Sequence, residues 1–300
     1  MSTIPDGIVT PSVIDRSAEL DLDQSVGTWR RWSRNPSSVI GGIIVAVIIL
    51  LALLSLAWTP YNPLSIDPAH TLAGSSATHL LGTDEYGRDV LSRLMAGSQV
   101  TLFVGTLSVL VAAGIGIPTG LLAAQRGGAV GQLVLRLTDI LYGFPALLAA
   151  VVLAAGFGAS KITVVLAIGI SNIPVFIRVT RSNALVVLRS EYVLAARAYG
   201  RRPYAIMRRH VLPNIATMII AQMSLLFSLA VLAEAALDFL GLGTAAPAAS
   251  WGTMLQSSQN YLGSNPLLTV WPSLVIIVCV LGFSLLGDGI GELHDVRSRR

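Results

Sequence analysis

Four charged residues lie close together in a polar segment of this 300-residue chain: Asp84, Arg88, Asp89 and Arg93. Carboxylates and guanidinium groups at such spacing can form ion pairs with one another or hold a polar ligand. Two histidines, His70 and His79, come shortly before them, and together with Asp84 they could ligate a metal ion. Their separations match no tight ligand spacing, so histidines without a metal are favoured in this segment.

The sequence shows no set of residues typical of an enzyme. It has no Ser/His/Asp, Cys/His or His-Glu-x-x-His pattern, and all four histidines lie in polar segments or tails: His70, His79, His210 and His294. A Gly-x-x-x-x-Gly-Lys-Ser/Thr phosphate loop is also missing, since the single lysine, Lys161, follows Ser160. We therefore expect no catalytic, metal or cofactor site in this chain, and no nucleic-acid partner.

A second polar stretch, residues 182–213, predicts structure of its own. The run from Glu191 to Gly200, followed by two arginines and Pro203, is typical of a short helix that ends at a glycine. A second helix is expected from Tyr204 to about Val211. Both would carry apolar residues on one side and arginines on the other, so composition alone favours two helices lying on anionic lipid.

The composition places most of the chain in a membrane. Hydrophobic residues make up 53% and charged residues only 12%, with a mean hydropathy of +0.71, whereas soluble domains carry about 25% charged residues. Apolar stretches of about 20 residues are long enough for membrane helices and too long for barrel strands. A soluble globule is excluded, and the single cysteine, Cys279, cannot form an internal disulfide.

We therefore expect an all-α polytopic membrane protein with six transmembrane helices. Their predicted limits are 39–58, 100–124, 133–156, 162–180, 215–233 and 267–287. The remaining parts are an N-terminal tail over 1–38, a loop over 59–99, a core over 100–288 that contains the 182–213 loop, and a C-terminal tail over 289–300. Trp29, Arg30, Arg31 and Trp32 in the first tail are expected to form an interfacial anchor.

The distribution of basic residues predicts the orientation. If the N-terminus is inside, the inner segments hold 17 of the 20 arginines and lysines, and the outer ones hold only Arg88, Arg93 and Lys161. By the positive-inside rule, both termini and the 182–213 loop are cytoplasmic, and the 59–99 loop is extracytoplasmic. The expected location is the cell membrane, which the chain crosses several times.

Two acids and two glycine pairs lie within the predicted spans. Asp139 and Glu234 are near span ends, where they are expected to reach water or pair with a base such as Arg136. The spacing of Gly116 with Gly120, and of Gly287 with Gly291, permits close helix contact. Because the chain has 28 glycines, such matches arise easily and carry little weight.

The 182–213 loop resembles the EAA loop of the permeases of ABC importers. That pattern has two alanines, a glycine four residues later and a Leu-Pro ending, met here by Ala195, Ala196, Gly200, Leu212 and Pro213. The sequence departs from it at Leu194, where an acid is usual, and at His210, where isoleucine is usual. Glu191 and Asn214 complete a form most similar to the permeases of dipeptide and oligopeptide importers.

Other segments resemble the C-type permease of that pair, so the similarity covers most of residues 81–295. They are Gly82 to Asp89 with Gly87 and Arg88, the segments 238–243 and 250–255, and Gly287-Asp288-Gly289. At the last of these, Gly291 and Glu292 replace the Arg and Asp of the family pattern. The similarity weakens mainly in the N-terminal tail.

The resemblance implies the fold of a type I ABC importer permease and a set of partners. These are a second permease, one or two ATPases that bind ATP and Mg²⁺, and an extracytoplasmic binding protein that touches residues 60–97 and 242–270. The loop would dock on the ATPase through Glu191, Ala195, Ala196, Arg197, Gly200, His210, Leu212 and Pro213. Arg197, Arg201 and Arg202 would pair with acids on that partner.

The function implied by the resemblance is import of di- or oligopeptides. Related permeases import nickel chelates or other small solutes, and the residues do not exclude these. A secondary transporter or channel is less favoured, because the span centres lack charges and the halves show no repeat. The outer motif of Gly82, Asp84, Gly87, Arg88, Asp89 and Arg93 has two open interpretations, an internal salt-bridge cluster or a contact with a partner or substrate.

Overall fold

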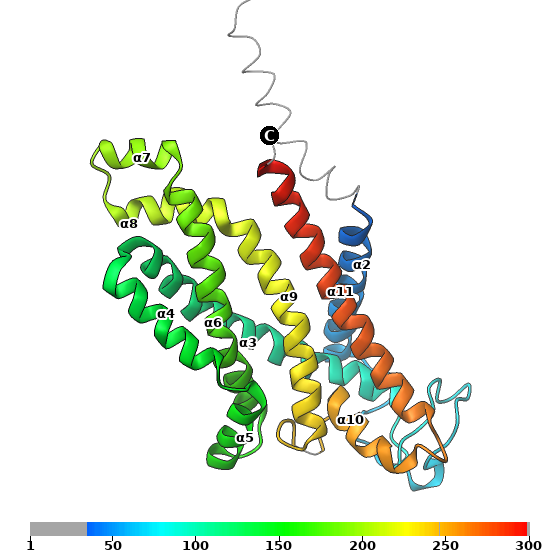
Figure 1. Cartoon of the computed structure of the whole chain (residues 1–300). Coiled ribbons are helices and arrows are strands. Elements are labelled where there is room, and N and C mark those ends of the chain that lie inside the picture. The colour runs from blue at the N-terminus through cyan, green and yellow to red at the C-terminus, as the bar shows by residue number, and fades with distance from the viewer. Residues whose placement is uncertain (1–34, 246, 299–300) are drawn as a thin grey trace, which may run out of the picture.

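The computed structural model describes residues 35–245 and 247–298, which form a bundle of helices and one long irregular segment (Figure 1). The long helices are α2 (Pro36–Ala57), α3 (Val90–Arg126), α6 (Lys161–Leu188), α9 (Leu212–Phe239) and α11 (Leu267–Ser298). The shorter ones are α4 (Gly128–Tyr142), α5 (Ala146–Phe157), α7 (Glu191–Ala198), α8 (Pro203–Ile206) and α10 (Trp251–Ser258). The predicted anchor of Trp29, Arg30, Arg31 and Trp32 lies outside the described residues.

The long helices are apolar enough to cross a membrane. Five helical stretches pass this test by length and composition: Pro36–Ala57, Val90–Arg126, Lys161–Leu188, Pro203–Phe239 and Leu267–Glu292. The pair α4 and α5 makes a sixth if it is counted as one bent span. The parts of the chain that the structure describes hold no β-strand, only an isolated bridge between Thr83 and Asp89. The expectation of an all-α polytopic membrane protein is therefore confirmed.

The stretch expected as a single helix over 133–156 is broken in the structure. α4 ends at Tyr142, α5 begins at Ala146, and the two helices are bent by 79° relative to each other. Pro145 explains the break, because it lacks an N–H and keeps Phe144 out of helical geometry. The extended backbone of Pro145 (ψ 128°) then starts α5 in a new direction.

Other helices run further than their apolar stretches. α3 begins at Val90, ten residues before position 100, because the Asp89 side chain caps it by accepting the Ser92 N–H at 2.8 Å. α6 continues to Leu188 and α9 to Phe239, past the expected ends at 180 and 233. α11 extends past 287 into the segment expected as a tail. Hydropathy marks the part of a helix that lies in lipid, whereas caps determine where the helix ends.

Close packing at glycines joins α3 to α6. A Cβ atom added at Gly116 would lie 2.5 Å from the Phe176 Cβ, and one at Gly120 would lie 2.8 Å from the Ile177 carbonyl oxygen. α11 packs against both α9 and α2 in the same bundle. The spacing of Gly116 and Gly120 carried little weight as a sequence pattern, but in the structure both glycines lie at a close contact between two helices.

The elements gather at two ends of the bundle (Figure 1). α7, α8, the start of α2 and the end of α11 lie at one end, which we call the α7 end. The irregular segment 58–89 and α10 lie at the opposite end, which we call the α10 end. That the α7 end faces the cytoplasm remains a prediction from the basic residues.

Candidate functional site

α7 is a short helix that stands beyond the long helices at the α7 end (Figure 1). Val193 anchors it, being fully buried in the main hydrophobic cluster. Glu191 in the first turn and Arg197 in the last turn match the helix dipole. Val193 is thus the buried side chain that holds α7 against the bundle.

A glycine ends α7. Gly200 has a φ of +73°, its N–H donates to the Arg197 carbonyl at 2.9 Å, and the Arg201 N–H donates to the Ala196 carbonyl at 3.2 Å. This pair of bonds is a Schellman motif, in which the residue after the helix must take the left-handed conformation that glycine adopts without strain. Gly200 therefore decides where α7 stops and how the chain turns back.

The outward side of α7 is apolar and exposed. Tyr192 and Leu194 are about half exposed, and Tyr199 is 89% exposed. Ala195 is also exposed, so the surface between these side chains is shallow. An exposed apolar surface of this kind is typical of a contact with a partner protein or with lipid.

A π-helical turn connects this region to α9. It spans Met207–Val211, and the Leu212 N–H donates to the Met207 carbonyl five residues earlier. Pro213 follows directly, and its ring would clash with the carbonyl of Arg209 in a regular α-helix, so the turn widens. Met207 and Val211 are buried, whereas Pro213 is exposed.

The structure divides the predicted loop residues into two groups. Glu191, Ala195, Ala196, Arg197 and Gly200 lie on α7 or directly after it, whereas His210, Leu212 and Pro213 lie in the π turn and the start of α9. The Tyr192 and His210 rings join the groups, with centroids 6.2 Å apart. α7 therefore lies beside the π turn that leads into the long helix α9.

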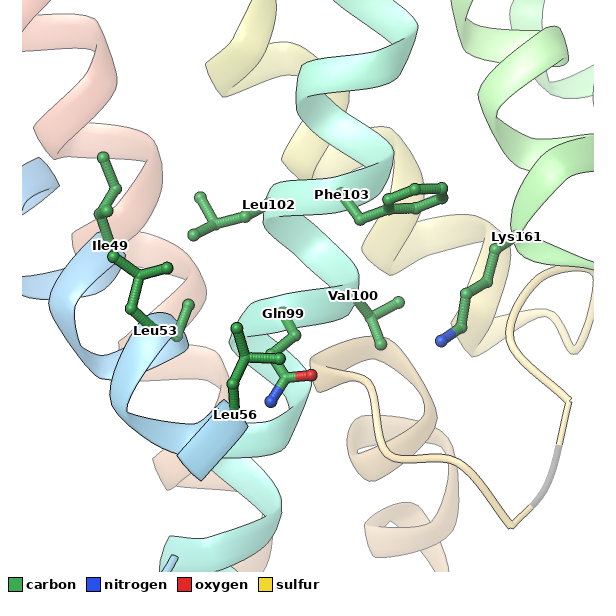
Figure 2. Close-up of a pocket in the computed structure, with 9 residues that line it drawn as sticks. Ile49, Leu53, Leu56, Gln99, Val100, Leu102, Phe103 and Lys161 are labelled. Atoms are coloured by element: carbon green, nitrogen blue, oxygen red, sulfur yellow. The ribbon is translucent and has the colours of Figure 1, made fainter. Parts of the chain in front are cut away.

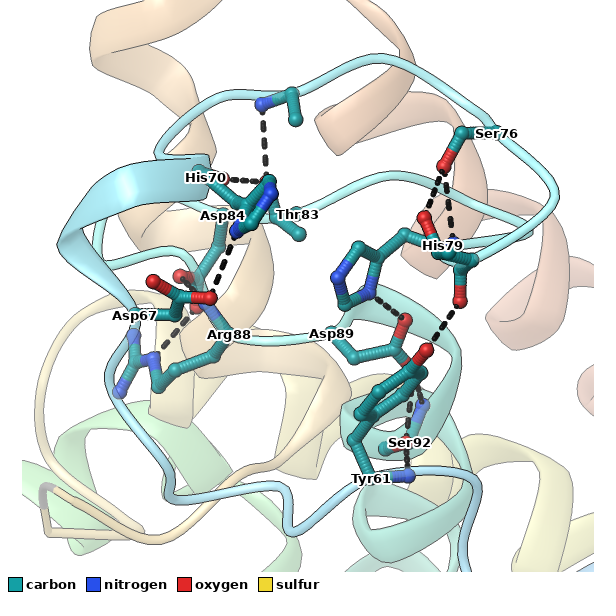
Figure 3. Close-up of polar contacts among 12 residues, drawn as sticks. Tyr61, Asp67, His70, Ser76, His79, Thr83, Asp84, Arg88, Asp89 and Ser92 are labelled. Carbon is teal, nitrogen blue, oxygen red and sulfur yellow. Dashed lines mark hydrogen bonds and ion pairs between the residues drawn. The ribbon is translucent and has the colours of Figure 1, made fainter.

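At the α10 end, a buried carboxylate organises the outer motif (Figure 3). Asp84 Oδ2 lies 2.7 Å from Arg88 Nε and 3.3 Å from Arg93 Nε. Asp84 Oδ1 accepts the backbone N–H groups of Tyr86 and Arg88, both at 2.9 Å. Asp84, Arg88 and Arg93 are all buried, and Glu85 Oε1, 3.4 Å from an Arg88 nitrogen, supplies the second negative charge that balances the two arginines.

A second carboxylate, Asp89, links the irregular segment to α3. Its Oδ2 accepts the Ser92 hydroxyl at 2.7 Å, and its Oδ1 lies 3.0 Å from the Nδ1 of His79 (Figure 3). The Ser92 hydroxyl in turn accepts the Tyr61 N–H at 3.0 Å. The start of α3 and two points of the 58–89 segment are therefore held together by one network.

Two glycines of the motif allow its tight turns. Gly82 and Gly87 have φ values of +80° and +75°, and a Cβ atom at Gly87 would lie 1.8 Å from the Asp67 carbonyl oxygen. With the buried ion pairs, this geometry favours the internal-cluster interpretation of the outer motif. Leu80 and Tyr86 are large apolar side chains that are exposed in this part of the segment.

The two histidines of this segment each face an acid. His70 Nδ1 lies 2.8 Å from Asp67 Oδ2, and this hydrogen bond holds the pKa of Asp67 below its usual range. The His70 and His79 ring centroids are 6.0 Å apart. Among the described residues, no three His, Cys, Asp or Glu side chains cluster as metal ligands. Both histidines act in loop hydrogen bonding.

A group of hydrogen bonds around Asp238, which we call the Asp238 latch, links α9 to the start of α10. The sequence did not predict it. Asp238 Oδ1 accepts the Thr244 N–H at 2.7 Å, and its Oδ2 accepts the Ser250 hydroxyl. Trp251 then donates its indole N–H to the Leu94 carbonyl of α3 at 3.0 Å. The sequence offers one sign of this arrangement, because Ser250 is a residue typical of a helix N-cap. Its bond to Asp238 could not be predicted, because Asp238 lies twelve residues earlier in the chain.

Of the two acids expected near span ends, Asp139 meets the expectation, since it is exposed and pairs with a base, and Glu234 does not. Asp139 pairs with Arg178 of α6 at 2.7 Å, not with Arg136. Glu234 does not reach water, because it is 1% exposed and accepts a hydrogen bond from the Thr101 hydroxyl at 3.2 Å. α9 extends past the expected span end, which places Glu234 inside the bundle rather than at its rim.

A cavity of about 420 Å³ opens between α2 and α3 (Figure 2). Its walls are mainly apolar, with Leu53, Leu102 and Phe103 among them, and Gln99 and Lys161 supply the polar groups. Gln99 donates to the Ser55 hydroxyl at 2.7 Å. No residue of the predicted sites lines this cavity, and its lining suits an aliphatic chain better than a polar solute.

Comparison with protein families gives two matches. Residues 116–300 match the family described as binding-protein-dependent transport system inner membrane component. Residues 24–74 match the N-terminal transmembrane domain of oligopeptide transport permease C. Together these matches cover α7 and the first span, α2.

Several relatives are similar over nearly the whole chain. The dipeptide transport system permease protein of Alkalihalophilus pseudofirmus is 36% identical, covering 93% of each chain. The di/tripeptide transport system permease protein of Pseudomonas aeruginosa is 38% identical, covering 89% of this chain and 90% of that one. The glutathione transport system permease protein of Pectobacterium atrosepticum is 36% identical, covering 91% and 93%.

Among solved structures, an inward-facing form of the MetNI methionine ABC transporter shares the fold. It has a TM-score of 0.57 and 19% identity, and the match covers 67% of this chain and 95% of that chain. The fold, the family matches and the relatives agree with one another. This chain belongs to the family of binding-protein-dependent transport system inner membrane components, the membrane-spanning permease subunits of ABC importers.

Proposed function

We propose that this permease subunit imports di- and oligopeptides. The support comes from relatives whose names specify dipeptides, di- and tripeptides or glutathione, which is itself a tripeptide. The match of residues 24–74 to an oligopeptide permease domain points the same way. The substrate class is thus supported by similarity over both parts of the chain.

The observation that carries the proposed mechanism is the exposed apolar side of α7. One or two ATPase subunits dock on Tyr192, Leu194 and Tyr199 and bind the ATP and Mg²⁺, since this chain has no phosphate loop. When the ATPases close around ATP, α7 moves as a body about Gly200. The π turn carries that movement into α9.

The pathway requires a second permease in this proposal. Five or six spans rarely enclose a pathway alone, and the lipid-exposed helices offer surface for a homologous subunit. An extracytoplasmic binding protein delivers the peptide at the α10 end, where Leu80 and Tyr86 are exposed. The rigid network of Asp84 and Asp89 holds that surface in shape.

A co-purification experiment tests the proposal. The chain, tagged after Arg300 and expressed with its neighbouring genes, is purified in mild detergent, and ATPase activity is measured with the binding protein and added solutes. A second permease and an ATPase should co-purify, and dipeptides, tripeptides or glutathione should stimulate hydrolysis. Stimulation by a nickel chelate and not by peptides would mean that the transporter imports nickel chelates instead of peptides. A chain that purifies alone, without ATPase activity, would refute the importer.

A pair of variants tests the docking surface itself. Leu194→Asp places a charge on the outward side of α7 and should abolish co-purification of the ATPase. Leu80→Asp places the same charge on an exposed leucine at the opposite end and should leave it intact. Equal ATPase recovery with both variants would move the docking surface away from α7.

A further inference from the structure

A separate cavity lies behind α7, on the side that faces the bundle. It has a volume of about 290 Å³ and lies between α7, α8, the end of α3 and the end of α6. Leu188, Ile206 and Met207 supply an apolar floor, and Gln125, Arg197 and Arg201 supply the polar groups. A cavity with two guanidinium groups above apolar side chains has the chemistry of a site for an amphipathic anion.

The local structure of α7 directs both arginines into this cavity. Arg197 follows the buried Val193 by four residues, so the two share one side of the helix. Arg201 is brought back beside that side by the turn at Gly200, in which its N–H bonds to the Ala196 carbonyl. Arg197 thus lies between the buried side of α7 and Leu194, and Arg197 and Arg201 both line the cavity while remaining exposed to solvent.

The charge of these arginines is not compensated within the described residues. Neither guanidinium forms an ion pair or a side-chain hydrogen bond with a residue that the structure describes, unlike Arg88, Arg93 and Arg178. Further arginines surround the α7 end in the sequence: Arg126, Arg189, Arg202, Arg208 and Arg209. A positive cavity in a positive region attracts an anion strongly and repels a cation.

We propose that this cavity binds a phosphate group held by Arg197, Arg201 and the Gln125 amide. The planar guanidinium fork matches phosphate oxygens, and an amide N–H adds a neutral donor. The phosphate comes from the headgroup of an anionic phospholipid, whose glycerol and acyl carbons would lie on Leu188, Ile206 and Met207, or from soluble phosphate. Occupation ties α7 to the end of α3 and so holds the coupling helix in one position.

Binding is measured on the purified transporter complex, or on this chain alone if nothing co-purifies. Native mass spectrometry counts bound dioleoylphosphatidylglycerol against dioleoylphosphatidylcholine, and competition with inorganic phosphate tests the soluble source. The double variant Arg197→Gln/Arg201→Gln should lower the affinity for phosphatidylglycerol about tenfold or more. Phosphatidylcholine binding should not change. Displacement of the lipid by millimolar phosphate would assign the site to the soluble ion instead.

The control removes the same charge elsewhere. Arg202 and Arg208 are exposed, as Arg197 and Arg201 are, but they do not line the cavity, so Arg202→Gln/Arg208→Gln should bind phosphatidylglycerol like the wild type. An equal loss in both double variants would mean general surface attraction and would overturn the site. So would lipid and phosphate binding that survive in Arg197→Gln/Arg201→Gln while the ATPase is lost, since the arginines would then contact a protein.

The effect on coupling rests on the proposed function, but the binding assay does not. If the chain binds phosphatidylglycerol through these arginines and shows no peptide-stimulated ATPase activity, the proposed function fails and the site stands. If transport is intact and neither phosphate source binds, the site fails and the proposed function stands. The two failures are therefore distinguishable.

Discussion

At the scale of single residues, the requirement for glycine at position 200 has more than one possible cause. Its backbone is in the left-handed region, and a Cβ atom added there would meet nothing within 4 Å in the chain itself. The requirement for glycine therefore comes from the backbone conformation and from whatever partner approaches, not from packing within this subunit. Substitutions can separate these two causes.

We expect a graded series at Gly200. Asn, which tolerates the left-handed region, should retain most peptide uptake; Ala, which costs about 1–2 kcal/mol there, should lower it several-fold. Trp should abolish uptake, because its ring adds bulk at the docking surface of α7. Uptake of a labelled dipeptide by cells that lack their own importer measures the effect, and immunoblots of membranes check that each variant inserts.

The outcome distinguishes the role of the turn from that of the surface. If the Asn and Ala variants transport equally well and only the Trp variant fails, glycine is required because a partner protein comes close to position 200. Backbone strain would then not be the reason. Normal uptake by Gly200→Trp would be incompatible with a coupling role for α7. Loss of the protein from the membrane in all three would instead assign Gly200 to folding.

At the scale of elements, the contact between α3 and α6 depends on missing side chains. Gly116 lets the α3 backbone approach Phe176 and the Ile173 carbonyl, at 2.5 and 2.9 Å from the position of an added Cβ. Lipid offers helices no hydrophobic gain on association, so such close van der Waals contact is what holds them together. The pair is consequently sensitive to a single added group.

Gly116→Val should destabilise the protein by about 1–3 kcal/mol, since the added group must displace backbone atoms of α6. The midpoint of thermal aggregation of the detergent-solubilised protein, followed by size-exclusion chromatography, should fall. Gly114 lies on the same helix with nothing within 4 Å of an added Cβ, so Gly114→Val is the matched control. Equal midpoints for the two variants would argue against packing at Gly116.

At the scale of the whole molecule, the two ends of the bundle are held together in different ways. The α10 end is rigid, with the ion pairs of Asp84 and the Asp238 latch tying the irregular segments to α3 and α9. The α7 end carries a short helix held by Val193 and a glycine turn. This difference suits the proposed mechanism, in which a binding protein docks at the α10 end and α7 moves with the ATPases.

The orientation of these ends is testable by cysteine labelling. Ser75 and Ala129 are exposed at the α10 and α7 ends, and the native Cys279 is fully buried, so the unmodified chain is the control. A membrane-impermeant maleimide should label Ser75→Cys in intact cells with an accessible outer face. It should label Ala129→Cys only after permeabilisation. The reverse pattern would invert the topology.

Composition and local spacing by themselves determined much of this protein. The apolar stretches indicated a helical membrane protein, and Gly200 with Pro203 indicated the limits of a short helix at the right place. The order of residues from Ala195 to Pro213 also indicated the family. These features are readable because hydropathy, turn chemistry and motif spacing depend on residues close together in the chain.

Only the tertiary structure decided which side chains meet. Asp84 could have faced a ligand, but it is buried between two arginines; Glu234 could have reached water, but it lies against Thr101 of α3. The direction of Arg197 depends on which side of α7 Val193 anchors to the bundle. These outcomes follow from contacts between residues far apart in the chain, which no local pattern specifies. An isolated helix exposes all of its sides, and only packing against other helices determines which side is buried.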